Sequence, residues 1–128
     1  MESVPSTAWT VLFGFGYTVS RDDYFSMFTD ERFHLLTASS GREALTLFND
    51  HPEVSLVILT AAMDSCSGFD ILNQMKSVRS DIPVFLLSSR ISFESLKLAS
   101  LCGCNEFLQL PLQKGELIAL INKYLYQP

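Results

Sequence analysis

The amino-acid sequence predicts an α/β domain built on a doubly wound parallel sheet. Five short apolar runs alternate with segments of helical pattern along the 128 residues. Strands that alternate with helices pair in parallel through right-handed crossovers, which places helices on both faces of the sheet. A hydrophobic content of 48%, with ten phenylalanines, supports one core in a chain of this length.

The five expected strands are dominated by Val, Ile, Leu and Phe, the pattern of strands that are buried on both faces. They are WTVLFGF (9–15), FHLLTA (33–38), VSLVILT (54–60), IPVFLLS (82–88) and EFLQL (106–110). We expect residues 9–128 to form a single domain and residues 1–8 to form a loose N-terminus.

Five helices are expected after these strands. Three of them begin at a serine that precedes a carboxylate by three residues, a spacing that caps helix N-termini. The pairs are Ser20 with Asp23, Ser40 with Glu43, and Ser67 with Asp70. A fourth helix fits residues 92–101 and ends at Gly103, and a fifth fits residues 114–126, where apolar side chains recur on one face.

Charge and composition limit the partners and the location. The net charge is −5, whereas nucleic-acid binding needs a stripe of basic residues, so we expect no nucleic-acid partner. No segment approaches the roughly 20 apolar residues of a membrane span, and the N-terminus lacks the pattern of a signal peptide. We therefore expect a cytoplasmic protein that does not enter a membrane. The three cysteines are expected to be reduced thiols.

The carboxyl ends of the strands are where such sheets bind ligands or react. The residues expected there are Gly14 and Phe15 after the first strand, Thr60 after the third and Ser88 after the fourth. Several of these positions carry apolar or hydroxyl side chains, and none carries a charge. The sequence therefore predicts an uncharged mouth to the sheet.

The order of motifs resembles the receiver domain of bacterial response regulators over about residues 10–126. The resemblance rests on SSGREALTLF, VSLVILT, a seven-residue loop to GFDIL, IPVFLLSS and LCGCNEFLQLPLQKGELIALI. It implies a flavodoxin-like (βα)5 fold, a three-layer sandwich with a parallel sheet of order 2-1-3-4-5. It also implies a place in two-component signal transduction.

The resemblance assigns the family's functional positions to residues of this chain. Thr60 stands where the family has the aspartate that accepts a phosphoryl group from a histidine kinase. Gly14 and Phe15 stand where it has acidic magnesium ligands, and Leu110, before Pro111, where it has a lysine. Ser88 and Phe107 keep the family's hydroxyl and switch-aromatic character.

The chemistry of these residues also predicts that the site does not carry out phosphoryl transfer. Phosphoryl transfer needs a nucleophile, a divalent cation and fixed positive charge, and magnesium is held by carboxylates. Gly14, Phe15 and Leu110 supply none of these, and the Thr60 hydroxyl is un-ionised at neutral pH. We therefore expect no magnesium at the usual site, no cofactor and no enzyme activity. Phe15 and Leu110 are expected to fill the former ion cavity.

Two alternatives remain open. Asp64, in the loop after the third strand, is a substitute phosphoacceptor in a second interpretation. In a third, GFGYTVS (14–20) is a phosphate-binding loop of a flavodoxin-like small-molecule or nucleotide-binding protein. Against the third, Val19 replaces the last glycine of the dinucleotide fingerprint, and two nearby aspartates, Asp22 and Asp23, would repel a phosphate.

We expect an atypical receiver domain that works as a protein-interaction module without aspartyl phosphorylation. By the resemblance, the partner docks on the face made by the fourth helix, fifth strand and fifth helix. The partner is a kinase, an output domain or a second copy of the chain. The exposed positions expected on that face are Phe93, Lys97, Phe107 and Lys114.

Overall fold

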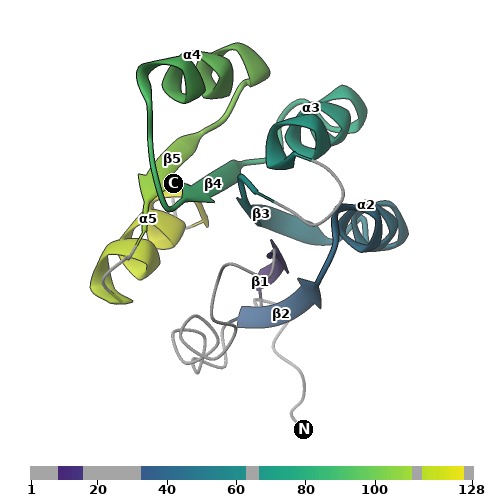
Figure 1. Cartoon of the computed structure of the whole chain (residues 1–128). Helices are drawn as coiled ribbons and strands as arrows, with labels where there is room; N and C mark the ends of the chain where they lie inside the picture. The colour runs from purple at the N-terminus through teal and green to yellow at the C-terminus, as the bar shows by residue number, and fades with distance from the viewer. Residues whose placement is uncertain (1–8, 16–32, 63–66, 111–113, 126–128) are drawn as a thin grey trace, which may run out of the picture.

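The protein is built on one five-stranded parallel sheet (Figure 1). The computed structural model describes residues 9–15, 33–62, 67–110 and 114–125. The strands are β1 (Trp9–Gly14), β2 (Phe33–Ala38), β3 (Val54–Thr60), β4 (Val84–Ser88) and β5 (Glu106–Gln109). Their order is β2-β1-β3-β4-β5, which confirms the predicted topology.

Helices pack on both faces of the sheet and complete a three-layer sandwich (Figure 1). The helices are α2 (Gly41–Asp50), α3 (Gly68–Val78), α4 (Phe93–Cys102) and α5 (Lys114–Leu125). One core lies between the sheet and α5, and a second lies between the opposite face and α2, α3 and α4. The helix predicted to begin at Ser20 and the N-terminal residues 1–8 lie outside the described residues.

The central strands are apolar at consecutive positions because each face of the sheet is covered. In β3, Ile58 belongs to the core under α5, and Val57 and Leu59 belong to the opposite core. In β4 the same alternation assigns Phe85 to the first core and Leu86 to the second. Since successive side chains of a strand point to opposite faces, both sets are buried.

Serine caps fix where the described helices begin. Ser40 Oγ accepts from the Glu43 N–H at 3.1 Å, as predicted for α2. Ser67 Oγ accepts from the Phe69 N–H at 3.1 Å, one residue earlier than the Asp70 spacing predicts. In α4, Ser92 Oγ accepts from the Ser95 N–H at 3.0 Å. These caps satisfy N–H groups that have no partner within the helix.

Gly103 ends α4 in a left-handed conformation, with φ of 84°. Its N–H donates to the carbonyl of Ser100, and the next N–H, of Cys104, donates to the carbonyl of Ala99. Glycine adopts this φ without the steric penalty that a Cβ imposes. The chain thereby turns directly from α4 into β5, as the predicted stop at Gly103 requires.

A lysine and an asparagine bind the amino ends of β4 and β5 to α3. Lys76 Nζ donates to the Ile82 carbonyl at 2.6 Å and to Asn105 Oδ1 at 2.9 Å. Asn105 Oδ1 also accepts from the Val84 N–H at 2.9 Å. Burial lowers the pKa of Lys76. This cluster lies at the amino end of the sheet, opposite to the carboxyl ends of its strands.

Within the described ranges, none of the helices has the length and apolar character to traverse a lipid bilayer. The longest of them, α5, has 12 residues. A bilayer core requires about 20 apolar residues in a helix.

Candidate functional site

The carboxyl end of β3 delivers Thr60 to the mouth of the sheet. Thr60 is the last residue of β3 and is only 2% exposed. It pairs with Leu87 of β4, and the following Ala61 N–H donates to the Leu87 carbonyl at 2.8 Å. The Thr60 side chain is therefore held by strands on the inside of the protein.

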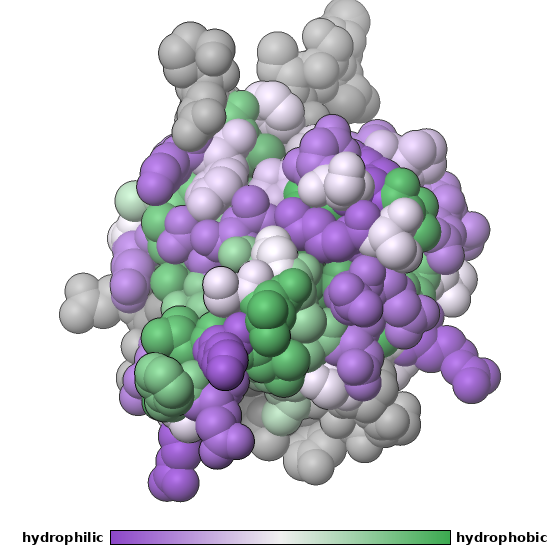
Figure 2. Space-filling model, turned by 90° about the horizontal axis from the view of Figure 1, so that it is seen from above, coloured by the Kyte–Doolittle hydropathy of each residue, from purple (hydrophilic) through white to green (hydrophobic). Residues whose placement is uncertain are grey.

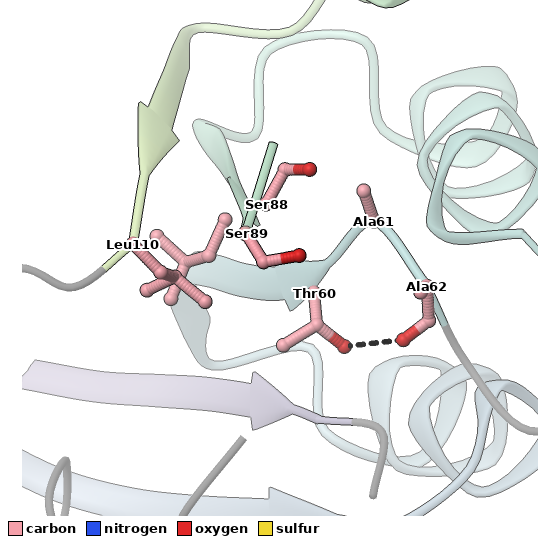
Figure 3. Close-up of a pocket in the computed structure, with 7 residues that line it drawn as sticks. Thr60, Ala61, Ala62, Ser88, Ser89 and Leu110 are labelled. Carbon is pink, nitrogen blue, oxygen red and sulfur yellow. Dashed lines mark hydrogen bonds between the residues drawn. The ribbon is translucent and has the colours of Figure 1, made fainter. Parts of the chain in front are cut away.

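The Thr60 hydroxyl is engaged with the backbone of its own loop. Thr60 Oγ1 donates to the Ala62 carbonyl at 3.0 Å, as the dashed line in Figure 3 shows. This is the local contact that hydroxyls near strand ends commonly make. Such a bond directs the proton of the hydroxyl toward the chain and away from a reacting group.

A small pocket of about 160 Å³ opens beside Thr60 (Figure 3). Its lining consists of Thr60, Ala61, Ala62, Leu87, Ser88, Ser89 and Leu110. The side chains that face it come from the ends of β3 and β4 and from the residue after β5. This lining contains three hydroxyls and no ionisable group among the described residues.

Ser88 and Leu110 form the far side of this pocket. Ser88 Oγ donates to the Arg90 carbonyl at 2.7 Å and accepts from the Arg90 N–H at 3.3 Å. The Leu110 N–H donates to the Ser88 carbonyl at 2.7 Å, which extends the β4–β5 pairing by one bond. The Leu110 side chain lines the pocket and also packs against the core under α5.

Phe15 lies away from that pocket, contrary to the expectation that it fills the same cavity as Leu110. The Phe15 ring is 9% exposed and meets the Phe13 ring edge to face, with centroids 5.8 Å apart. It lines a second pocket, of about 250 Å³, whose other walls are Thr37, Ser39 and Glu43.

The second pocket carries the only carboxylate in the described lining of either opening. Glu43 Oε1 accepts from the Ser39 N–H at 2.8 Å and from the Ser39 hydroxyl at 3.2 Å. This carboxylate is thus used at the start of α2. Gly14, at the end of β1, is buried and adds backbone only.

The start of α3 touches the backbone of Thr60. The Gly68 N–H donates to the Ala61 carbonyl at 2.8 Å. A Cβ at Gly68 would overlap the carbonyl oxygen of Thr60, so only glycine fits this approach. The loop between them, which contains Asp64 and Cys66, lies outside the described residues, as do Asp22, Asp23 and most of 14–20.

The predicted interface residues differ in exposure. Phe93 is 82% exposed and Lys97 is exposed, as expected. Phe107 is partly buried and packs against Phe69, because its side chain points toward the core under α3. Our expectation that Phe107 is exposed is therefore corrected. Lys114 begins α5, and its side chain is outside the described part of the structure.

The sequence analysis did not identify three leucines of α4 that are exposed in the structure. Leu96 is 52% exposed, Leu98 43% and Leu101 77%. The signal was present in SFESLKLASL, where apolar residues fall on all sides of a helix that has one face to bury. A helix of this pattern either sits inside a protein or leaves apolar side chains at the surface.

The cysteine pair beside Gly103 consists of thiols packed against the core. Cys102 and Cys104 are both free and both contact the core under α3. Burial raises the pKa of Cys104 to about 11 and raises the pKa of Cys102. Among the described residues, no group of three or more His, Cys, Asp or Glu side chains could hold a metal ion.

A partly buried hydrogen bond links β5 and α5. Tyr124 Oη donates to Glu106 Oε2 at 2.7 Å. Burial of the Tyr124 phenol, together with its bond to the Glu106 carboxylate, raises the pKa of Tyr124 to about 12. The pair lies near the amino end of β5, away from the Thr60 pocket.

Solved structures of receiver domains share this fold. The receiver domain protein from Clostridium thermocellum matches with a TM-score of 0.84 at 24% identity, over 92% of this chain and 94% of its own. The CheX–CheY–BeF3–Mg complex from Borrelia burgdorferi matches with a TM-score of 0.84 at 20% identity, over 98% and 100% of the two chains.

Sequence comparison identifies the family. Among curated proteins, the response regulator SaeR of Staphylococcus aureus is 28% identical over 108 residues, which cover 79% of this chain. That match covers 46% of SaeR, so the chain spans about half the length of this relative. The family model of the response regulator receiver domain matches residues 18–122. The chain therefore belongs to the response regulator receiver domain family of two-component signalling.

Proposed function

We propose that this receiver domain acts as a protein-interaction module whose output does not depend on phosphorylation of an aspartate. The observation that carries the proposal is the pocket at the end of β3. Thr60 replaces the carboxylate there, its hydroxyl donates to the Ala62 carbonyl, and the described lining carries no charge. The fold is retained and the reactive groups are absent from the described wall of the pocket.

The residues present do not fit a magnesium ion. Magnesium in proteins is held by one or two carboxylates together with water or phosphate oxygens. Gly14 and Phe15 have no side-chain oxygen, and the only described carboxylate nearby, Glu43, is bonded to Ser39 in the neighbouring pocket. Without a divalent cation, the negative charge on a phosphoryl group in transfer is not neutralised.

The lysine position is consistent with the loss of the carboxylates. A buried ammonium without a partner costs several kcal/mol, so a pocket without acidic residues is more stable with an apolar side chain. Leu110 packs against the core under α5 at this position. The replacements at Thr60 and Leu110 therefore support one another.

The proposed docking surface is the face formed by α4, β5 and α5. Phe93 and Lys97 are exposed on α4, and an exposed aromatic ring is a common anchor of protein interfaces. The partner is a kinase, an output domain or a second copy of the chain. No catalytic step is assigned to this domain.

The test is exposure to magnesium with a small phosphodonor, and separately with beryllofluoride. The CheY of Borrelia burgdorferi, whose complex holds BeF3 and magnesium, serves as the positive control. We expect the intact mass and the amide NMR spectrum of this chain to remain unchanged, while the control responds. An acid-labile adduct on Asp64, or a shift of the Thr60 and Ser88 amides with beryllofluoride, would refute the proposal.

A further inference from the structure

We propose that Cys102 and Cys104 are a thiol modification site, where a low-molecular-weight disulfide oxidises them to a reversible disulfide across Gly103. Both thiols are free and half-buried in the structure. They lie where α4 ends and the chain enters β5. This site is separate from the pocket that carries the proposed function, because it precedes the amino end of β5 and the Thr60 pocket lies at the carboxyl ends of the strands.

The backbone at Gly103 brings the Cα atoms of the two cysteines within the span of a disulfide. Gly103 has φ of 84° and ψ of 25°, in the left-handed helical region. A left-handed turn is close to the mirror image of a right-handed one and preserves its distances. Residues two apart in a helix have Cα atoms about 5.4 Å apart, by the helix radius and rise. Disulfides commonly join Cα atoms that are about 4.4–6.8 Å apart.

The two cysteine side chains lie on the buried side of α4. Cys102 follows Ala99 by three residues, so these side chains share one side of the helix. The Gly103 N–H donates to the Ser100 carbonyl and the Cys104 N–H to the Ala99 carbonyl, which together form a Schellman motif. This motif typically packs the second residue after the helix against its last turn, here Cys104 against Ala99. Both cysteines accordingly contact the core that contains Ala99.

The two thiols have different roles in the exchange. Cys102 reacts first, because the Cys104 Sγ is more deeply buried and donates to the Glu106 carbonyl at 2.8 Å. The Cys102 thiolate attacks one sulfur of the oxidant, so a mixed disulfide forms and one thiolate leaves. The Cys104 sulfur then attacks Cys102 Sγ, its proton passes to solvent, and the second thiolate leaves. The two cysteines lose two electrons, and the oxidant is reduced to two thiols.

The charged groups near the pair affect the rate of this exchange. Burial raises the pKa of Cys102, and the Asp70 carboxylate raises it further. Burial also raises the pKa of Cys104, the Glu106 carboxylate adds to this, and the Lys76 ammonium opposes it. Because the thiolate is the attacking species, the exchange should be slow at neutral pH and faster in mildly alkaline solution.

A disulfide that closes over one residue should be easily reduced. The stabilisation that a cross-link gives increases with the number of residues in the closed loop, and this loop contains only residues 102–104. Formation of the bond also removes the contact of Cys104 Sγ with the Glu106 carbonyl. Partly exposed or strained disulfides are the labile and regulatory kind. We therefore expect excess thiol to restore both cysteines.

The pair lies at the main attachment of α4 to the rest of the domain. All of α4 is described, and Ala99 is its only buried residue. The outer side of the helix is exposed, with Phe93 82% and Leu101 77% exposed, and Figure 2 shows apolar side chains gathered over α4. Because few buried contacts hold α4, a bond that redirects the two thiols beside Ala99 should shift the last turn of the helix.

The test is incubation of the chain with oxidised glutathione in mildly alkaline solution, followed by mass spectrometry without a reducing agent. Trypsin cleaves after Lys97 and Lys114, so both cysteines fall in the peptide of residues 98–114. We expect this peptide to lose the mass of two hydrogen atoms. Excess reduced glutathione should return the original mass.

Serine variants separate the roles of the two thiols. Cys104→Ser should retain glutathione on Cys102 as a mixed disulfide, because no second thiol displaces it. Cys102→Ser should leave Cys104 largely unmodified over the same time. Cys66→Ser is the matched control, since Cys66 lies outside the peptide 98–114, and should leave the loss of two hydrogens unchanged. Circular dichroism of each variant verifies that it is folded.

Amide NMR spectra of the oxidised chain test the effect on α4. The amides of Ala99, Cys104 and Glu106 should shift, whereas those of Val11 and Leu12 in β1 should not. Unchanged spectra at the end of α4 would overturn the structural effect.

Each remaining outcome also decides the proposal. A wild-type peptide of unchanged mass, one that holds only glutathione, or a bond that requires Cys66 overturns the disulfide between Cys102 and Cys104. A bond that persists in excess reduced glutathione overturns its reversibility. The beryllofluoride experiment is independent of all these results, because it reports on the Thr60 pocket.

Discussion

The ring of Phe107 in β5 meets the ring of Phe69 in the first turn of α3 edge to face. Their centroids are 5.9 Å apart and the ring planes are inclined by 79°. Both rings pack against the core under α2 and α3. The partly buried Phe107 of β5 is thus packed against a second ring from the first turn of α3.

A double-mutant cycle should measure this aromatic contact. Phe69→Leu and Phe107→Leu each remove one ring and keep most of the apolar volume. Edge-to-face pairs are worth about 0.5–1.5 kcal/mol beyond burial, so the two losses in unfolding free energy should be non-additive by about that amount. Urea denaturation gives the values. Phe93→Leu, on the exposed side of α4, is the control. Additive losses would contradict the contact.

The close approach of Gly68 to Thr60 predicts that an alanine substitution lowers stability at Gly68 but not at Gly115. Gly68→Ala should destabilise the protein by about 1–3 kcal/mol, the usual cost of overpacking, because its Cβ would overlap the Thr60 carbonyl. Gly115→Ala meets open space in α5 and should be neutral or stabilise by up to about 1 kcal/mol. Thermal unfolding of both variants provides the measurement. Equal stability of the two would be inconsistent with the structure.

Replacing Thr60 tests the pocket at the end of β3. Thr60→Val removes the bond to the Ala62 carbonyl and should cost about 0.5–1.5 kcal/mol. Thr60→Asp buries a carboxylate at a position that is 2% exposed, and should cost about 2–5 kcal/mol.

The aspartate variant also bears on magnesium. Because Gly14 and Phe15 still lack carboxylates, Thr60→Asp should gain no response to magnesium and beryllofluoride in amide NMR spectra. Tight binding of beryllofluoride by this variant would show that the described wall of the pocket is sufficient for the ion. Chemical denaturation of the same samples supplies the stability values.

Tyr124 should make stability depend on pH in the alkaline range. Its pKa is about 12 in the folded protein, against 10.0 ordinarily, so the unfolded chain loses the phenol proton first. The stabilisation is therefore fully present below pH 10 and is lost as the pH rises toward 12. The difference in unfolding free energy between the wild type and Tyr124→Phe should shrink over this interval. Glu106→Gln should lower the Tyr124 pKa, and an unchanged tyrosinate titration would contradict the role of Glu106.

The two thiols beside Gly103 should differ in reactivity. Burial raises the pKa of Cys104 to about 11, and its Sγ donates to the Glu106 carbonyl at 2.8 Å. Because the thiolate is the nucleophile, iodoacetamide at mildly alkaline pH should modify Cys104 more slowly than Cys102, as measured by peptide mass spectrometry. In urea the two rates should become similar. A faster reaction at Cys104 in the folded protein would contradict its burial.

The sheet was predictable because its strands are buried on both faces. Continuous apolar runs such as 54–60 can be recognised without knowing their neighbours, and the serines at 40 and 67 mark helix starts by local chemistry. The positions of side chains around the pocket were less predictable. Periodicity does not determine the direction of a residue just beyond a strand, so it could not show that Phe15 and Leu110 line different openings.

The partial burial of Phe107 in the edge strand β5 also could not be predicted from the sequence pattern. Phe107 lies in a strand of four residues, too short for alternation to show which face it occupies. Its burial depends on Phe69, which is distant in the sequence and comes close through the packing of α3. The exposure of Leu101 likewise depends on α4 burying only Ala99, which is decided by how the helix sits on the sheet.

The contacts of Lys76 and Asn105 should make the amino end of the sheet more rigid than its carboxyl end. Two hydrogen bonds join Lys76 of α3 to Ile82 and Asn105, and a third joins Asn105 to Val84 at the start of β4. If a partner that binds to α4 displaces the backbone of β4 and β5, the displacement should therefore increase with distance from these bonds. Amides around Ser88 and Leu110 should then exchange with solvent sooner than those around Val84 and Asn105.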